Sequence, residues 1–140
     1  KTKNFVLGIV TVMMIFSFIS CSTKAVFLAS SMVPAAEGYV KVKKDNNNNY
    51  VIQMQISNLA GVERLQPPKQ TYVVWMVTNQ GLTKNIGRVN SSKNLKVSFE
   101  TVSSFRPIQI FITAEDNESA QYPGEQVVIS TDKFWSKAVD

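Results

Sequence analysis

The stretch that decides the fold reads Thr71-Tyr72-Val73-Val74-Trp75-Met76-Val77-Thr78. Successive side chains of a strand point to opposite faces, so Trp75 lies on the face opposite to Tyr72 and Val74. Both faces are apolar, which is typical of a strand that is covered on both sides. We therefore expect residues 71–78 to form a central strand, and the rest of the chain to supply the layers that cover it.

On the N-terminal side of this strand, the sequence predicts a β-hairpin. Val40 and Val42 alternate with lysines, and apolar and polar side chains alternate with a period of two over residues 50–57. The intervening residues 45–49 are one aspartate and four asparagines, which tolerate the left-handed backbone of a turn. Two alternating runs joined by turn-forming residues favour a hairpin. A long connection with several prolines then leads to the central strand.

On the C-terminal side, four more runs have the periodicity of strands. Their approximate ranges are 83–89, 95–100, 108–113 and 126–130. Gly87, inside the first of them, predicts a bulge or a close approach of the backbone to a neighbour. About seven short strands with turn signals between them predict an all-β fold, a small antiparallel β-sandwich over residues 35–131. Residues 132–140 are expected to form a C-terminal tail.

The first 20 residues have the composition of a secretory signal peptide. Residues 1–4 are basic and polar, and residues 5–19 form an apolar run, shorter than the ~20 residues that a transmembrane helix needs. Cys21 follows directly after Ile19-Ser20, and this junction resembles the lipobox of bacterial lipoproteins. The resemblance implies that residues 1–20 are removed and that Cys21 carries a diacylglycerol and becomes the first residue of the mature chain.

A lipid on Cys21 also accounts for the presence of a single cysteine. A free thiol in an exported protein is reactive, and several acyl chains, palmitate among them, provide the two or more lipid signals that stable anchoring requires. The alternative is a signal-anchor helix that happens to contain Cys21. We expect a protein of the bacterial cell envelope, anchored to a membrane on its periplasmic or outer-membrane face, with residues 21–34 as a lipidated tether.

The composition excludes several classes of function. The chain has no histidine, which excludes Ser-His-Asp and Cys-His nucleophiles and metal sites built on imidazole. Without Lys1 and Lys3 the 15 basic residues become 13, against 10 acidic ones, a net charge of only +3. The densest basic run, Lys41, Lys43 and Lys44, lacks interleaved aromatics, and we interpret it as the solvated face of an exposed strand edge. We expect no nucleic-acid partner.

Two tryptophans are the candidate binding residues. A buried Trp75 would be part of the core, whereas an exposed one would offer an aromatic platform for a sugar or for a partner's side chain. Trp135 belongs to the run Lys133-Phe134-Trp135, near the end of the chain. This run either forms an interaction point on the tail or folds back to cover a sheet edge.

The densest acidic run is Glu115-Asp116-Asn117-Glu118. It lacks the regular ligand offsets and the glycine of a calcium loop, so we interpret it as a solvated loop and expect no metal. Glycosidase chemistry needs two carboxylates with opposed protonation states, and no such pair stands out among the scattered Asp and Glu residues. We therefore expect no catalytic residues, and no cofactor apart from the covalent lipid on Cys21.

Four short motifs, in order, resemble the extracytoplasmic domain of anti-sigma-K factors over roughly residues 35–131. They are Tyr72-Val73-Val74-Trp75-Met76-Val77, Ile86-Gly87-Arg88-Val89, Ile110-Phe111-Ile112-Thr113-Ala114-Glu115, and Tyr122-Pro123-Gly124 followed by Val127-Val128. The family's sigma-binding half and its membrane span have no counterpart in this sequence. The resemblance thus implies a sensing or interaction domain without anti-sigma activity. It also implies a structural role for Glu115, at the strand end or toward the following turn.

These features predict a non-catalytic lipoprotein that binds an envelope protein, as a sensor or an accessory module. Two alternatives remain. One is a structural subunit of an envelope assembly, in which an edge strand pairs with another protein by β-augmentation. The other is a domain that binds a glycan or another ligand through Trp75 or Trp135.

Overall fold

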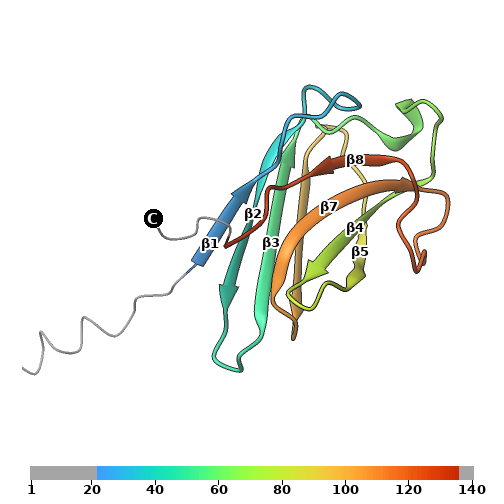
Figure 1. Ribbon diagram of the computed structural model, residues 1–140. Helices are drawn as coiled ribbons and strands as arrows, with labels where there is room; N and C mark the ends of the chain where they lie inside the picture. Colours follow the sequence, from blue (N-terminus) through green and yellow to red (C-terminus); the bar gives the residue numbers. More distant parts are fainter. Residues whose placement is uncertain (1–21, 136–140) are drawn as a thin grey trace, which may run out of the picture.

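The computed structural model describes residues 22–135 (Figure 1). The predicted signal peptide, Cys21 and the last five residues of the predicted tail lie outside the described residues. Within residues 22–135, no helix is long and apolar enough to cross a membrane.

In the part of the chain that the structure describes, eight strands form two antiparallel sheets of four strands each, which confirms the prediction of an all-β fold. The first sheet has the strand order β1-β2-β3-β6, and the second has the order β5-β4-β7-β8. The strands are β1 (Ser22–Val26), β2 (Glu37–Lys44), β3 (Tyr50–Ser57), β4 (Thr71–Thr78), β5 (Thr83–Val89), β6 (Val97–Ser103), β7 (Pro107–Glu115) and β8 (Val127–Ser130). A short 3-10 helix, η2 (Val62–Arg64), interrupts the connection between β3 and β4.

The predicted hairpin is formed by β2 and β3, and its turn is built as the sequence indicates. The Asp45 carboxylate accepts hydrogen bonds from the backbone N–H groups of Asn47 (2.8 Å) and Asn49 (2.9 Å). Asn48 adopts the left-handed backbone, with φ of 60°. Aspartate and asparagine are suited to such turns because their short side chains bond to nearby backbone groups.

Within the segment expected to form a tether, residues 22–26 form strand β1. Ser22 pairs with Lys43 of β2, and Phe27, just after β1, forms a bridge with Thr131 beyond β8. The strand was missed because its pattern is inverted. A small residue, Ala25, is buried, whereas Val26 points outward with 64% of its surface exposed.

Strand β1 also changes the position of the three lysines of β2. They were expected at an exposed strand edge, but β2 lies between β1 and β3 in the interior of its sheet. Lys41 and Lys43 alternate with the buried Val40 and Val42 and so lie on the outer face of that sheet, where Lys41 is exposed and Lys43 is half-buried; Lys44 is exposed at the end of the strand. The prediction that these lysines lie on a solvated face is therefore confirmed, whereas the prediction that they lie on an edge strand is not.

Side chains from both sheets form one hydrophobic cluster. It includes Val40, Val42, Ile52, Met54 and Ile56 from the first sheet, and Tyr72, Val74, Met76, Ile110 and Ile112 from the second. On β4, these are the alternate residues of a single face, here called the inner face. Val73 and Trp75, on the outer face of β4, are equally buried but lie outside the cluster. The expectation that β4 is covered on both sides is confirmed.

Gly87 accounts for an irregularity in β5. The register between β4 and β5 shifts between Val74 and Trp75, which pair with Gly87 and Asn85. Gly87 has φ of +149°, and a Cβ atom there would lie 2.8 Å from the ring of Phe99 on β6. Both predictions for this glycine, the bulge and the close approach, are confirmed.

The antiparallel strands give the molecule two distinct ends (Figure 1). The Ser22 end, as we call it, holds the start of β1, the turns at residues 45–49 and 79–82, and the connection at residues 104–106. The far end holds the connections at residues 58–70 and 90–96 and the loop at residues 116–126. Both clefts described below lie at the far end.

Candidate functional site

Two polar clefts lie at the far end, on either side of the connection between β3 and β4. The η2 cleft has a volume of about 500 Å³ and is lined by Gly61, Val62, Glu63, Arg64, Gln70, Asn90, Ser91, Ser92, Lys93 and Leu95. The Glu115 cleft has a volume of about 440 Å³ and is lined by Gln66, Pro67, Lys69, Ala114, Glu115, Gly124, Glu125 and Gln126. Residues 61–70 thus contribute to the walls of both clefts, so that the two form a single candidate binding region.

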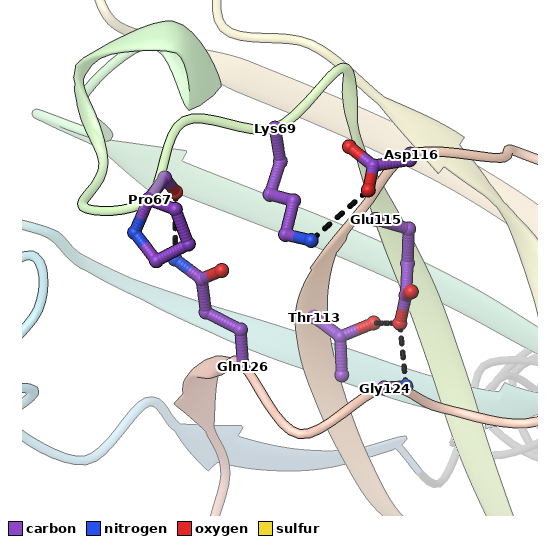
Figure 2. Close-up of polar contacts among 7 residues, drawn as sticks. All are labelled: Pro67, Lys69, Thr113, Glu115, Asp116, Gly124 and Gln126. Carbon is purple, nitrogen blue, oxygen red and sulfur yellow. Dashed lines mark hydrogen bonds and ion pairs between the residues drawn. The ribbon is translucent and has the colours of Figure 1, made fainter.

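The Glu115 carboxylate is held in place by its own strand and by the loop that follows (Figure 2). Oε1 of Glu115 accepts hydrogen bonds from the Thr113 hydroxyl (2.5 Å) and from the backbone N–H of Gly124 (2.7 Å). A Cβ atom at residue 124 would lie 2.9 Å from Oε2 of Glu115, so a larger residue there would displace the carboxylate. This arrangement agrees with the structural role that the sequence resemblance implied for Glu115.

The same network reaches the buried tryptophan of β4. Nε1 of Trp75 donates a hydrogen bond to Oγ1 of Thr113 (2.8 Å), and that hydroxyl in turn donates to Glu115. A hydroxyl can accept and donate at once, and linked hydrogen bonds of this kind reinforce one another in a low-dielectric interior. The carboxylate at the cleft is therefore connected through one hydroxyl to the interior of the protein.

Two polar contacts join the opposite walls of the Glu115 cleft (Figure 2). Nζ of Lys69 lies 3.0 Å from a carboxylate oxygen of Asp116, and Nε2 of Gln126 donates to the carbonyl of Pro67 (3.3 Å). The backbone adds a further link, because the N–H of Gln70 donates to the carbonyl of Glu115 (3.0 Å). The cleft is thus bounded by segments that are fixed to each other.

The acidic run at residues 115–118 does not converge on a common point. Glu115 turns toward Gly124, Asp116 pairs with Lys69, and Glu118 forms an ion pair with Arg88 on β5. Within residues 22–135, no group of three or more His, Cys, Asp or Glu side chains is arranged to hold a metal ion. The run spreads its charges over three separate contacts.

Tyr72 lies next to the η2 cleft, on the inner face of β4. Its hydroxyl donates a hydrogen bond to the carbonyl of Ala60 (2.6 Å), which fixes the connection that leads into η2. Burial of the phenol, and to a lesser degree the nearby Glu63 carboxylate, raises the pKa of Tyr72 to about 12. Both causes disfavour the phenolate. The tyrosine stays neutral over the physiological range and has a structural role.

The structure places the two candidate tryptophans in different environments. Trp75 has no exposed surface and stacks against Phe111 with ring centroids 6.4 Å apart. It is therefore a core residue, and the stacking platform that was its alternative is not accessible. Trp135 is 39% exposed and lies at the Ser22 end, where its Nε1 donates to the carbonyl of Pro107 (2.9 Å). Neither tryptophan lines either cleft.

The run Lys133-Phe134-Trp135 folds back onto the domain, which was one of the two expectations for it. Phe134 is buried, and its backbone N–H donates to the carbonyl of Ile108 (2.7 Å) at the start of β7. Trp135 lies against Arg106, with the guanidinium carbon 4.4 Å from the ring centroid. Cys21, the predicted lipidation site, lies outside the described residues.

The clefts can bind polar groups by hydrogen bonds. The Glu115 cleft presents a carboxylate, an ammonium and an amide, from Glu115, Lys69 and Gln126. Sequence reasoning singled out only Glu115 among these. The prolines before β4 and Pro123-Gly124 before β8 were visible as turn signals, but which connections meet depends on the pairing of β4 with β7.

In the comparisons with known proteins, no protein-family model matches the chain and no curated protein matches it. The assignment of a function therefore depends on the residues and contacts described above.

Proposed function

We propose that this protein is a membrane-anchored lipoprotein of the bacterial cell envelope, in which a small antiparallel β-sandwich acts as a non-catalytic binding module. The lipid is attached to Cys21, and the partner is an envelope protein. One observation carries the proposal. Ser22, the residue after the cysteine, starts β1 at the end of the molecule opposite the two clefts. An anchor at Cys21 thus leaves both clefts facing away from the membrane.

In the proposed mechanism, the anchor acts by holding the domain at a membrane surface. Acyl chains confine the domain to a membrane surface, which raises its effective concentration toward other molecules of that surface. The clefts supply polar recognition. In the Glu115 cleft, the charged side chains of Lys69 and Glu115 already have partners within the protein, Asp116 and Gly124. Such held groups suit a hydrogen-bonded contact with a polar partner segment, because little side-chain freedom is lost on binding.

The sensing part of the proposal comes from the sequence resemblance to anti-sigma-K factors. The motifs that carry it fall on β4, β5, β7 and the approach to β8, the four strands of the second sheet. In this proposal the chain shares with that family an extracytoplasmic module that contacts other envelope proteins. It does not include anti-sigma activity.

A second candidate function, a structural subunit of an envelope assembly, is favoured by the two strand edges. Strands β5 and β6 are the outermost strands of their sheets on one side of the molecule. On the other side, the bridge between Phe27 and Thr131 joins the edges of β1 and β8. An added strand from a partner would therefore pair with β5 or β6.

The anchor is tested by mass spectrometry on the full chain produced in a bacterial host. We expect the mature protein to begin at Cys21 with a mass increase for a diacylglycerol and an added acyl chain, and to partition into membranes. The matched variant Cys21→Ser should keep its leader and lose the lipid mass. An unmodified Cys21 in the wild-type chain, or a Cys21→Ser variant that carries the same added lipid mass, would contradict the anchor.

The binding site is tested by photo-crosslinking in intact cells, with the crosslinking residue at one of three positions. Lys93 lies in the η2 cleft, Val102 lies on β6, and Lys41 lies on the outer face of the first sheet. We expect one defined envelope protein to be crosslinked from position 93 and from neither other position. Crosslinks from position 102 alone would instead support the structural subunit, and an equal pattern from all three positions would overturn both.

A further inference from the structure

The Ser22 end carries basic and aromatic side chains in stacked pairs. The pairs are Lys44 over Tyr50 (5.9 Å to the ring centroid), Lys84 over Phe105 (4.6 Å) and Arg106 over Trp135 (4.4 Å). They come from both sheets and from the connection between β6 and β7. A cation near an aromatic face is attracted to it, so each pair fixes the position of a charge that is still open to water.

These pairs lie on segments that follow one another across the Ser22 end. Ser22 is paired with Lys43, and Tyr50 on the neighbouring strand is paired with Ser103. Residues 104–106 then carry the chain to the second sheet, where the N–H of Asn79 donates to the carbonyl of Arg106 (2.9 Å). Figure 1 shows the start of β1, the β2–β3 turn and the β6–β7 connection at the same end of the molecule.

The charge of this surface is positive. Its basic residues are Lys43, Lys44, Lys84, Arg106 and Lys133, and its acidic residues are Asp45 and Asp132. Both of these carboxylates accept hydrogen bonds from backbone N–H groups of their own turns. Most of the other described carboxylates lie at or near the far end: Glu37, Glu63, Glu115, Asp116, Glu118 and Glu125. The two ends therefore differ in charge.

Apolar side chains are exposed on the same surface. Leu82, in the turn between β4 and β5, has 48% of its surface exposed, and Trp135 has 39%. The indole N–H of Trp135 is already bonded to Pro107, so the exposed part of this side chain is carbon. Tryptophan with lysine and arginine is the combination found at membrane–water interfaces, where the rings lie at headgroup level and the charges meet lipid phosphates.

The covalent geometry leaves this surface no room to move away from a lipid on Cys21. Ser22 is already paired in the sheet, so a single residue separates the lipid from folded structure. One residue spans roughly 4 Å. A domain held so closely must turn the surface around Ser22 toward the headgroups, whatever else it contacts.

We propose that the Ser22 end is a docking surface for the anionic headgroups of the bilayer in which the protein is anchored. Docking fixes the orientation of the domain, with the far end and its clefts directed outward. This proposal rests on the proposed function, because the anchor brings the surface to the membrane. Each basic residue near an anionic surface adds attraction that salt screens, so the orientation depends on charge and on salt.

The test uses the full lipidated chain reconstituted in two kinds of vesicle. One contains phosphatidylglycerol and phosphatidylcholine in equal parts, and the other contains phosphatidylcholine alone; both carry brominated acyl chains that quench nearby tryptophans. We expect quenching of Trp135 in the anionic vesicles, much less in the neutral ones, and a loss of this difference at high salt. Trp75 is buried and contributes a constant signal, which Trp135→Phe isolates.

A pair of charge-matched variants separates docking from net charge. Lys44→Glu with Arg106→Glu reverses two charges at the Ser22 end, and Lys93→Glu with Lys96→Glu reverses two at the far end, with the same net charge. We expect the first variant to reduce the docked fraction by at least about tenfold, and the second to leave it nearly unchanged. Co-flotation of the protein with the vesicles measures attachment through the lipid, independently of docking.

The outcomes distinguish the two proposals. Wild-type protein that floats with the vesicles but shows no lipid-dependent quenching of Trp135, or equal losses in the two charge variants, overturns the docking surface and leaves the anchor intact. Protein that does not float after lipidation overturns the anchor. Circular dichroism of each variant confirms that the sheets are retained, and Lys44→Gln with Arg106→Gln repeats the test if the glutamate variant does not fold.

Discussion

The two faces of β4 are equally buried, but they are covered in different ways. The inner face, with Tyr72, Val74 and Met76, packs against apolar side chains of the other sheet. The outer face, with Val73 and Trp75, lies outside that cluster, next to the loop that joins β7 and β8. This loop is fixed by hydrogen bonds, because the side-chain amide of Asn85 on β5 donates to the carbonyls of Glu118 and Ala120.

The difference matters because the two kinds of cover respond to different changes. Apolar packing between sheets depends on volume, whereas the cover of the outer face depends on a few polar contacts that also shape the Glu115 cleft. A change in the cleft is therefore expected to reach Trp75, and a change in the inter-sheet cluster is expected to leave the cleft intact. Four predictions test this comparison, from the largest expected effect to the smallest.

Replacing the outer-face tryptophan should have the largest effect. Trp75→Ala removes a fully buried ring and leaves a large cavity, so we expect a loss of about 3–5 kcal/mol in the free energy of unfolding, measured in urea. Trp75→Phe keeps most of the ring and loses the bond to Thr113, so its cost should be clearly smaller. A cost below about 1 kcal/mol for the alanine variant would show that the outer face is not a core.

The inner face is tested by alkaline pH through Tyr72. The folded pKa of about 12 exceeds the unfolded value of 10, so the unfolded state releases the phenolic proton first. This contribution to stability is complete below pH 10 and is lost as the pH rises from 10 to about 12, for a total on the order of 2 kcal/mol. Urea unfolding of wild type and Tyr72→Phe across this range should show a steeper decline for wild type; parallel curves would contradict the assignment.

The link between the cleft and the outer face is tested by Glu115→Ala. The variant leaves the Thr113 hydroxyl and the N–H of Gly124 without their acceptor, and we expect a loss of about 1–2 kcal/mol. Amide hydrogen exchange should become faster in residues 116–126, and the fluorescence of Trp75 should change. Ile112→Val, in the inter-sheet cluster, is the matched control: it should cost a similar amount and leave exchange in that loop unaltered.

The ion pair across the cleft should matter least for stability. The side chain of Asp116 is 67% exposed and that of Lys69 is 26% exposed. Exposed pairs of this kind are worth less than about 1 kcal/mol, so Asp116→Ala should shift the urea midpoint only slightly. A loss as large as that of Glu115→Ala would mean that the cleft is held together by its ion pair and not by the Glu115 network.

The sequence predicted the elements whose side chains follow a regular pattern. The β2–β3 hairpin and β4 were recognised because alternation and continuous apolarity are set by the layers on each side of a strand. Strand β1 was missed because its buried residue Ala25 is small and its outward residue Val26 is apolar, which inverts the pattern.

The candidate site was less predictable, for a physical reason. Asn85 bonds to backbone carbonyls, which every residue carries, so nothing in the sequence marks its partners. The position of Lys69 opposite Asp116 depends on the pairing of β4 with β7, which lie far apart in the chain. Glu115 was assigned a structural role only through the sequence resemblance, and its contact with Gly124 agrees with it.

Strand β1 has a mechanical consequence for a chain held at its N-terminus. Ser22 lies at one end of the strand, and every residue of β1 is paired with β2. A pull on the N-terminus along the strand loads these backbone bonds in shear, so that they resist together and do not open one after another. Beyond the strand, the bridge from Phe27 to Thr131 passes part of the load to the second sheet. A pull applied at Ser22 would therefore be resisted by the whole of β1 at once.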